Sequence, residues 1–216
     1  MPSLRLAALA AAAFMTFGPV AAVAQQVPAP NDKGQWVEPP RDLPKVSPRG
    51  GGGGGDPTRN LDFLFEALKV APDDATAKAV EQRIWAVLMV SKSDTANLLM
   101  TRVRSAVEGK DVDLALKLLD SIVTIRPDYV EAWNRRATLH FLRKDYAASL
   151  ADLAQVLRRE PRHFGALSGL GLILHEIGDD KRALAAYRRA AEIYPRLENL
   201  AEQIRKLTET VEGRDI

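Results

Sequence analysis

The sequence predicts an all-α solenoid of stacked helix–turn–helix units, preceded by a disordered N-terminal linker. Three observations lead to this prediction. Pro127, Pro161 and Pro195 recur at intervals of 34 residues, small side chains recur at equivalent positions between them, and apolar residues follow helical spacing. A fixed period of this length is typical of repeat proteins, in which each unit buries its apolar face only against its neighbours.

Three repeats follow when each unit is numbered so that its proline is position 32: residues 96–129, 130–163 and 164–197. Positions 8, 20 and 27 carry mostly small residues. Paired helices approach most closely there, and a bulky side chain would overpack the contact at a cost of ~1–3 kcal/mol. Positions 4, 7 and 24 are mostly large and apolar, filling the space between helices. The proline ends the second helix, because it has no N–H to continue it.

The third repeat carries the pattern most completely, with residues Leu167, Leu170, Gly171, Gly178, Ala183, Tyr187, Ala190 and Pro195. The second supplies Trp133, Ala137, Tyr146, Leu153, Val156 and Pro161. The first is weaker, with Leu99, Ala115, Leu119, Ile122 and Pro127. Over at least residues 96–197 the chain resembles the tetratricopeptide repeat (TPR) family, and the resemblance implies a TPR-type α–α solenoid.

Composition excludes several classes of function. The 216 residues include 30 Lys and Arg against 28 Asp and Glu, a near balance that argues against nucleic acid or an anionic membrane surface as the main ligand. The chain contains no cysteine, so disulfides, thiolate metal sites, cysteine catalysis and lipidation at a cysteine are excluded. The domain must therefore be stable through its helical core.

Residues 1–24 have the layout of a bacterial secretory signal peptide. Arg5 precedes a short apolar run, and an Ala-Val-Ala cleavage site ends at Ala24. We expect cleavage after Ala24, a mature chain that starts at Gln25 with no membrane insertion, and a periplasmic destination, with secretion beyond it left open. The alternative is an uncleaved anchor, although the run is short for a membrane span.

Residues 25–55 form a linker rich in proline that ends in a glycine run from Gly50 to Gly55. Proline stiffens the first part and glycine makes the end flexible, and no apolar periodicity is present to bury a core. We expect a disordered spacer. The alternative is that the segment around Trp36 docks on a partner or on the solenoid.

The segments on either side of the repeats are also predicted to be helical. Residues 56–95 predict a degenerate N-terminal helical repeat, with Asp56 as the cap of its first helix and Pro57 at the first helical position. Residues 198–216 predict a half-polar helix that covers the last apolar face, as a solenoid requires.

The sequence offers little catalytic chemistry. The three histidines are His140, His163 and His175. We interpret His140, at position 11, as a packed or rim histidine rather than a ligand; His163 lies at a turn between repeats, and His175 stands beside Glu176. No metalloprotease, phosphate-loop or serine-hydrolase motif occurs. We therefore predict no enzyme activity, no cofactor and no metal site.

The resemblance implies a binding surface on the inner face, which first-helix positions 2, 5, 9, 12 and 13 line in this family. The residues that we assign to this groove on that basis are Met100, Arg104, Glu131, Asn134, Thr138, Phe141, Leu142, Ser168, Leu172 and His175. Their mixed character with an apolar centre suits a peptide or a partner helix. Some relatives clamp a C-terminal carboxylate with Lys and Asn at positions 5 and 9. Here those positions hold Met100, Arg104, Asn134 and Thr138, so such an adaptor is not supported.

With its signal-peptide layout, the chain resembles small exported TPR proteins of Gram-negative bacteria, which are generally scaffolds or adaptors. The resemblance implies a non-catalytic scaffold or adaptor of the bacterial cell envelope that binds another envelope protein. The alternative is an accessory or small-ligand-binding module of an envelope enzyme or transport system, with its pocket between the N-terminal helices and the first repeat.

Overall fold

A computed structural model describes residues 60–213, which form helices and no strands. The predicted signal peptide, linker and Asp56 cap lie outside the described residues. The helices are α3 (Leu61–Lys69), α4 (Asp74–Leu88), α5 (Asp94–Glu108), α6 (Val112–Ile125), α7 (Val130–Leu142), α8 (Tyr146–Arg159), α9 (Phe164–Glu176), α10 (Asp180–Ile193) and α11 (Leu200–Val211). No helix in this part of the chain is long and apolar enough to cross a membrane.

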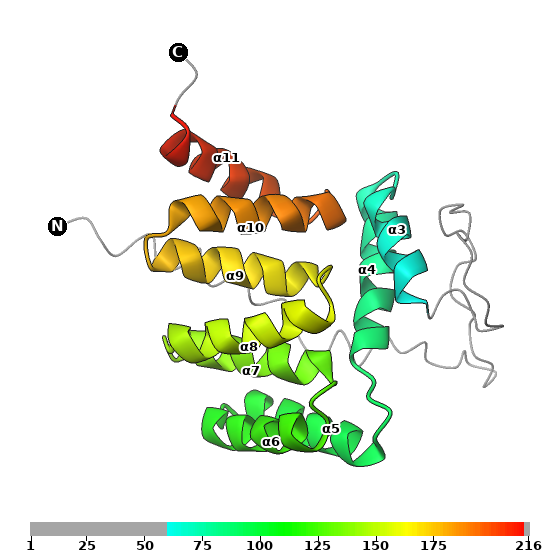
Figure 1. Ribbon diagram of the computed structural model, residues 1–216. Helices are drawn as coiled ribbons and strands as arrows, with labels where there is room; N and C mark the ends of the chain where they lie inside the picture. The colour runs from blue at the N-terminus through cyan, green and yellow to red at the C-terminus, as the bar shows by residue number, and fades with distance from the viewer. Residues whose placement is uncertain (1–59, 214–216) are drawn as a thin grey trace. The chain divides into compact units, whose positions relative to one another are not determined.

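Helices α5–α10 form the three predicted helix pairs, stacked side by side (Figure 1). Each pair turns at repeat position 15, where Lys110, Lys144 and Gly178 all have positive φ. The next residue, Asp111, Asp145 or Asp179, then caps the second helix by accepting a backbone N–H three residues on. The same turn therefore recurs in each repeat, although only the third uses the glycine that favours this backbone conformation.

The third repeat confirms why its small residues are needed. A Cβ added to Gly171 would lie 2.6 Å from Cε1 of Tyr187, whose ring is buried on the facing helix. Ala183 and Ala190 on α10 are fully buried. The two helices thus approach at a distance that excludes even a methyl group at position 8.

Arg136 stands at position 7, where an apolar residue is usual. Its guanidinium pairs with Asp152 at 2.7 Å and with Asp120 at 2.8 Å, and so joins α7 to α8 and to α6 of the preceding repeat. Asp152 is buried. This polar contact takes the place of an apolar one between the first two repeats.

The N-terminal helices differ from the predicted arrangement. Helices α3 and α4 pack together as a hairpin, and α3 begins at Leu61 with Asn60 as its cap. The hairpin does not extend the stack beyond α5. Instead α4 runs across the ends of the stacked helices, along the edge where the turns between repeats lie (Figure 1), and α3 packs against α10. A segment early in the chain thus contacts the last repeat.

The C-terminal helix lies against the last repeat. α11 packs on α10 and buries Leu200 and Leu207 in the same apolar cluster as Leu167 and Tyr187. Its outward residues are polar, so it closes this end of the stack.

Candidate protein-interaction surface

The first helices of the repeats, α5, α7 and α9, carry the ten residues assigned to the groove, and α7 contacts α9 directly. The ten residues differ widely in exposure. Leu142 and His175 are exposed. The residues in the partly buried class are Arg104, Asn134, Phe141 and Ser168. The buried ones are Met100, Glu131, Thr138 and Leu172. Only part of the assigned surface is therefore accessible to a partner.

Helix α4 covers the N-terminal ends of α7 and α9. The ring of Trp85 stands edge-on to His163 and Phe164, with centroid separations of 5.4 and 5.2 Å. A Cβ at Gly165 would lie 2.9 Å from the same indole, so position 2 of the third repeat has no room for a side chain. The hairpin and the repeats are closely packed here.

Glu131 lies in this covered region as a buried carboxylate. Its oxygens lie 3.1 Å from Nε of Arg135, 3.2 Å from the amide of Asn134 and 3.4 Å from Nε2 of His163. Burial alone would raise the pKa of Glu131, but Arg135 and His163, with Asn134, hold that pKa below its ordinary value. This acid is therefore a charged anchor within the second repeat, between the start of α7 and the turn before α9.

His163 completes the same anchor from the turn before α9. Its Nδ1 accepts the backbone N–H of Ala166 as the cap of α9, at 3.0 Å, while Nε2 faces Glu131. The side chain is only 1% exposed. The bonding of Nδ1 to a donor indicates that the proton of the neutral ring is on Nε2, directed at Glu131.

The hairpin is attached to all three turns that follow a repeat. Near the first, the hydroxyl of Tyr129 donates to the carbonyl of Met89 at 2.5 Å. Near the third, the hydroxyl of Tyr194 donates to the buried carboxylate of Glu81 at 3.2 Å. Arg196 reaches the carbonyls of Ala71 and Pro72 and the carboxylate of Asp74. With Trp85 at the second turn, α4 and the residues on either side of it thus contact the turns of all three repeats.

The sequence pattern did not single out these anchors. The available signal was the presence of large side chains at positions 31, 34 and 1, represented by Tyr194, Tyr129, His163 and Phe164, which lie outside the apolar pattern of the repeat. Their partners on α4 gave no signal of their own, because Trp85 and Glu81 also suit an ordinary amphipathic helix.

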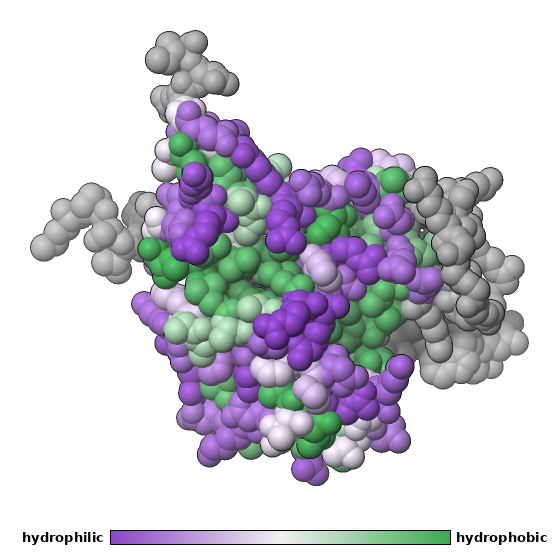
Figure 2. Space-filling model, viewed as in Figure 1, coloured by the Kyte–Doolittle hydropathy of each residue, from purple (hydrophilic) through white to green (hydrophobic). Residues whose placement is uncertain are grey.

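The C-terminal ends of α7 and α9 remain open. Leu142 is 47% exposed at the end of α7, beside Phe141, whose ring lies 5.9 Å from that of Tyr146. His175 is exposed at the end of α9 and contacts Asp180. Figure 2 shows apolar surface gathered and hollowed in the region of α9, between α8 and α10. An apolar surface with a polar rim is a favourable place for a protein contact.

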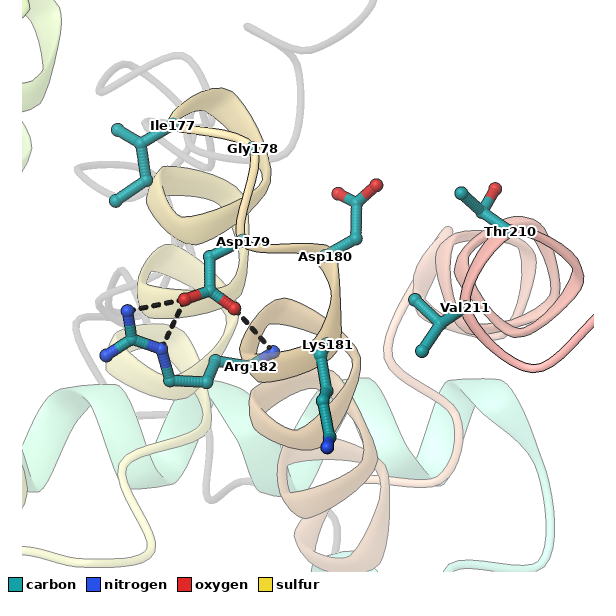
Figure 3. Close-up of a pocket in the computed structure, with 8 residues that line it drawn as sticks. All are labelled: Ile177, Gly178, Asp179, Asp180, Lys181, Arg182, Thr210 and Val211. Atoms are coloured by element: carbon teal, nitrogen blue, oxygen red, sulfur yellow. Dashed lines mark hydrogen bonds and ion pairs between the residues drawn. The ribbon is translucent and has the colours of Figure 1, made fainter.

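A hollow of about 530 Å³ adjoins the turn between α9 and α10 (Figure 3). In it Asp179 is directed at Arg182 of its own helix, while Asp180 and Lys181 lie across from Val211 of α11. Its lining residues are Ile177, Gly178, Asp179, Asp180, Lys181, Arg182, Thr210 and Val211. Within residues 60–213 no group of three or more His, Asp or Glu side chains is placed to hold a metal ion.

Comparison with known proteins decides the family. A tetratricopeptide repeat family model matches residues 100–153 and 145–198. A TPR repeat-containing protein of Rhizobium etli is 42% identical over 157 residues, which cover 73% of this chain and 77% of the relative. The chain belongs to the TPR family.

Two further similarities concern the TPR fold. Anaphase-promoting complex subunit 3 of Schizosaccharomyces pombe is 28% identical over 81 residues, only 12% of its length. A solved structure of MamA protein superimposes with a TM-score of 0.51 at 17% identity, covering 74% of this chain and 85% of that one. At this identity the likeness concerns the fold alone. TPR domains bind protein partners, and the TPR fold is typically non-catalytic.

Proposed function

We propose that this TPR protein is a non-catalytic adaptor of the bacterial cell envelope, which binds a peptide or a helix of a partner protein on the open part of its inner face. The observation that carries the proposal is the contrast between the two ends of α7 and α9. The start of α9 is covered by Trp85 and the start of α7 meets Met89 through Tyr129, whereas Leu142 is 47% exposed at the other end of α7.

The residues around Leu142 suit the apolar face of an amphipathic segment. Phe141 and Tyr146 form a partly buried aromatic pair that is held in place before a partner arrives. Binding to such a preformed surface loses little side-chain freedom. The exposed His175 and its partner Asp180, which is partly buried, supply a polar rim.

The experiment is capture of partners from a periplasmic extract by the immobilised mature chain, with identification by mass spectrometry. Leu142→Asp should remove the specific partners, because it places a charge in the centre of the contact. Ile125→Asp is the matched control, since Ile125 is also 47% exposed but lies on α6. Retention of every partner by Leu142→Asp, with both variants folded, would refute this surface.

The envelope location rests on residues 1–24, which lie outside the described residues. Their signal-peptide layout supports export to the periplasm. Intact-mass measurement of the exported protein should give a chain that starts at Gln25. Recovery of the uncleaved chain from the membrane fraction would contradict the proposed location without affecting the proposed binding surface.

The second candidate is a small-ligand-binding accessory module. The hollow of about 530 Å³ beside Lys181 is the place for its ligand, although it is an open surface depression and lies at the α9–α10 turn, not between the N-terminal helices and the first repeat as the sequence suggested. A thermal-shift screen against envelope metabolites separates the two candidates, because a protein adaptor should not respond. A hit that Lys181→Ala abolishes would favour the module.

A further inference from the structure

The outer face of α5 and α6 is a stacking surface without a neighbour in the described part of the chain. These two helices form the end of the stack opposite α11 (Figure 1). The hairpin of α3 and α4 precedes them in sequence but packs along the turns and against α10. No helix among residues 60–213 therefore occupies the place where a preceding repeat would pack.

Equivalent positions in the other repeats show what this face is built to do. Position 3 is fully buried in the second and third repeats, at Ala132 and Ala166, but Leu98 in the first is 56% exposed. Position 10 is buried at Leu139 and Ile173 in those repeats. In the first repeat the same position is the exposed Ser105. The exposed face is thus the one that an adjoining helix covers elsewhere in the molecule.

The face is apolar and hollowed. Leu114 on α6 is 45% exposed, and Leu118 beside it is half-buried. Between the helices is a hollow of about 470 Å³, lined by Arg102, Ser105, Ala106, Gly109, Asp111, Leu114 and Leu118. Exposed leucines around a hollow are unfavourable in water and favour burial by a second surface.

The two ends of the stack indicate which surface covers the outer face of α5 and α6. At the other end α11 turns its leucines inward and exposes Glu202, Arg205 and Glu209. This charged end cannot complement the apolar face, so head-to-tail stacking is disfavoured. The α5–α6 face itself is balanced in charge, because its hollow is lined by one cation, Arg102, and one acid, Asp111, and two copies can meet without net repulsion.

We infer that the outer face of α5 and α6 is the interface of a homodimer, in which two copies of this chain meet head to head around a two-fold axis. Such an arrangement buries Leu98 and Leu114 of both copies. It also leaves the ends of α7 and α9 that carry Leu142 free, so that each dimer presents two copies of the surface proposed for the partner.

The test is the mass of the mature chain by analytical ultracentrifugation over a range of concentrations. The wild type should reach twice the monomer mass. The double variant Leu98→Asp/Leu114→Asp should raise the dimer Kd by roughly 100-fold or more, because it buries unpaired carboxylates. Leu142→Asp is the control, with a comparable exposed leucine outside the face, and should leave the dimer intact. Circular dichroism confirms that each variant is folded.

Because the chain contains no cysteine, a single engineered cysteine can report which surfaces of two copies meet. Ser105→Cys, in the middle of the face, provides a unique thiol that should form a disulfide-linked dimer under mild oxidation, whereas Ile177→Cys at the other end should not. A wild type that stays monomeric at every concentration overturns the inference. A dimer that persists in the Leu98→Asp/Leu114→Asp variant also overturns the inference. So does a disulfide-linked dimer that forms as readily through Ile177→Cys as through Ser105→Cys.

Discussion

The close contact between Gly171 and Tyr187 predicts that replacing this glycine with alanine lowers the stability of the protein, although the same change in a helix usually raises it. In a helix interior, alanine is normally more stable than glycine by about 0.8–1.0 kcal/mol. Here the added methyl would lie 2.6–2.9 Å from three ring carbons of a buried tyrosine. Overpacking of this kind costs ~1–3 kcal/mol, which exceeds the gain in helix propensity.

Gly171→Ala should therefore destabilise the protein by about 1 kcal/mol, a fall in Tm of roughly 2–4 °C at this size. Gly171→Leu should cost more. The assay is urea denaturation followed by circular dichroism. In the background of Tyr187→Leu, which removes the ring, the same Gly171→Ala change should become neutral or stabilising. If Gly171→Ala raised the stability of the otherwise wild-type protein, the argument would be refuted, because the ring of Tyr187 would then be moving aside freely.

Three other predictions concern contacts between elements. Trp85→Ala should loosen the hairpin at the second turn and speed hydrogen exchange in α3 and α4 while α7–α10 stay protected; uniform exchange throughout would contradict this. The pKa of Glu131 is lowered on folding, so the stability that its charge contributes is present above the unfolded pKa and is lost as pH falls through the folded pKa. The difference in unfolding free energy between wild type and Glu131→Gln should accordingly stay constant above about pH 5 and shrink as pH falls below 4.5, the ordinary pKa of a glutamate, and a difference that stays constant at acid pH would count against an anchoring charge. Arg136→Leu should cost ~3 kcal/mol because it leaves Asp152 buried and unpaired, and adding Asp152→Leu should recover most of that loss; no recovery would place the cost elsewhere.

The sequence predicted which helix positions carry the candidate surface, but not which of those positions are exposed. The family pattern placed Leu142 and His175 on the first helices, and both are exposed. The same pattern named Met100 and Glu131, which are buried. The exposure of a position depends on what packs over it, and helix α4 does so at the start of α7 and α9.

The repeats themselves are specified locally, which is why the sequence determines them. The turn at position 15, the aspartate cap that follows and the small residues between paired helices all concern neighbours within one 34-residue unit. Such contacts recur with the period, and a period can be read from a sequence without coordinates.

The place of the hairpin was decided only in three dimensions. Glu81 meets Tyr194 across 113 residues, and Trp85 meets His163 only because stacking brings three turns to one edge. No local pattern on α3 or α4 distinguishes a helix pair that stacks on α5 from one that crosses the turns, because both must bury one apolar stripe. The same tertiary choice left Leu98 and Leu114 exposed at the end of the stack, since the helices that precede α5 are used elsewhere.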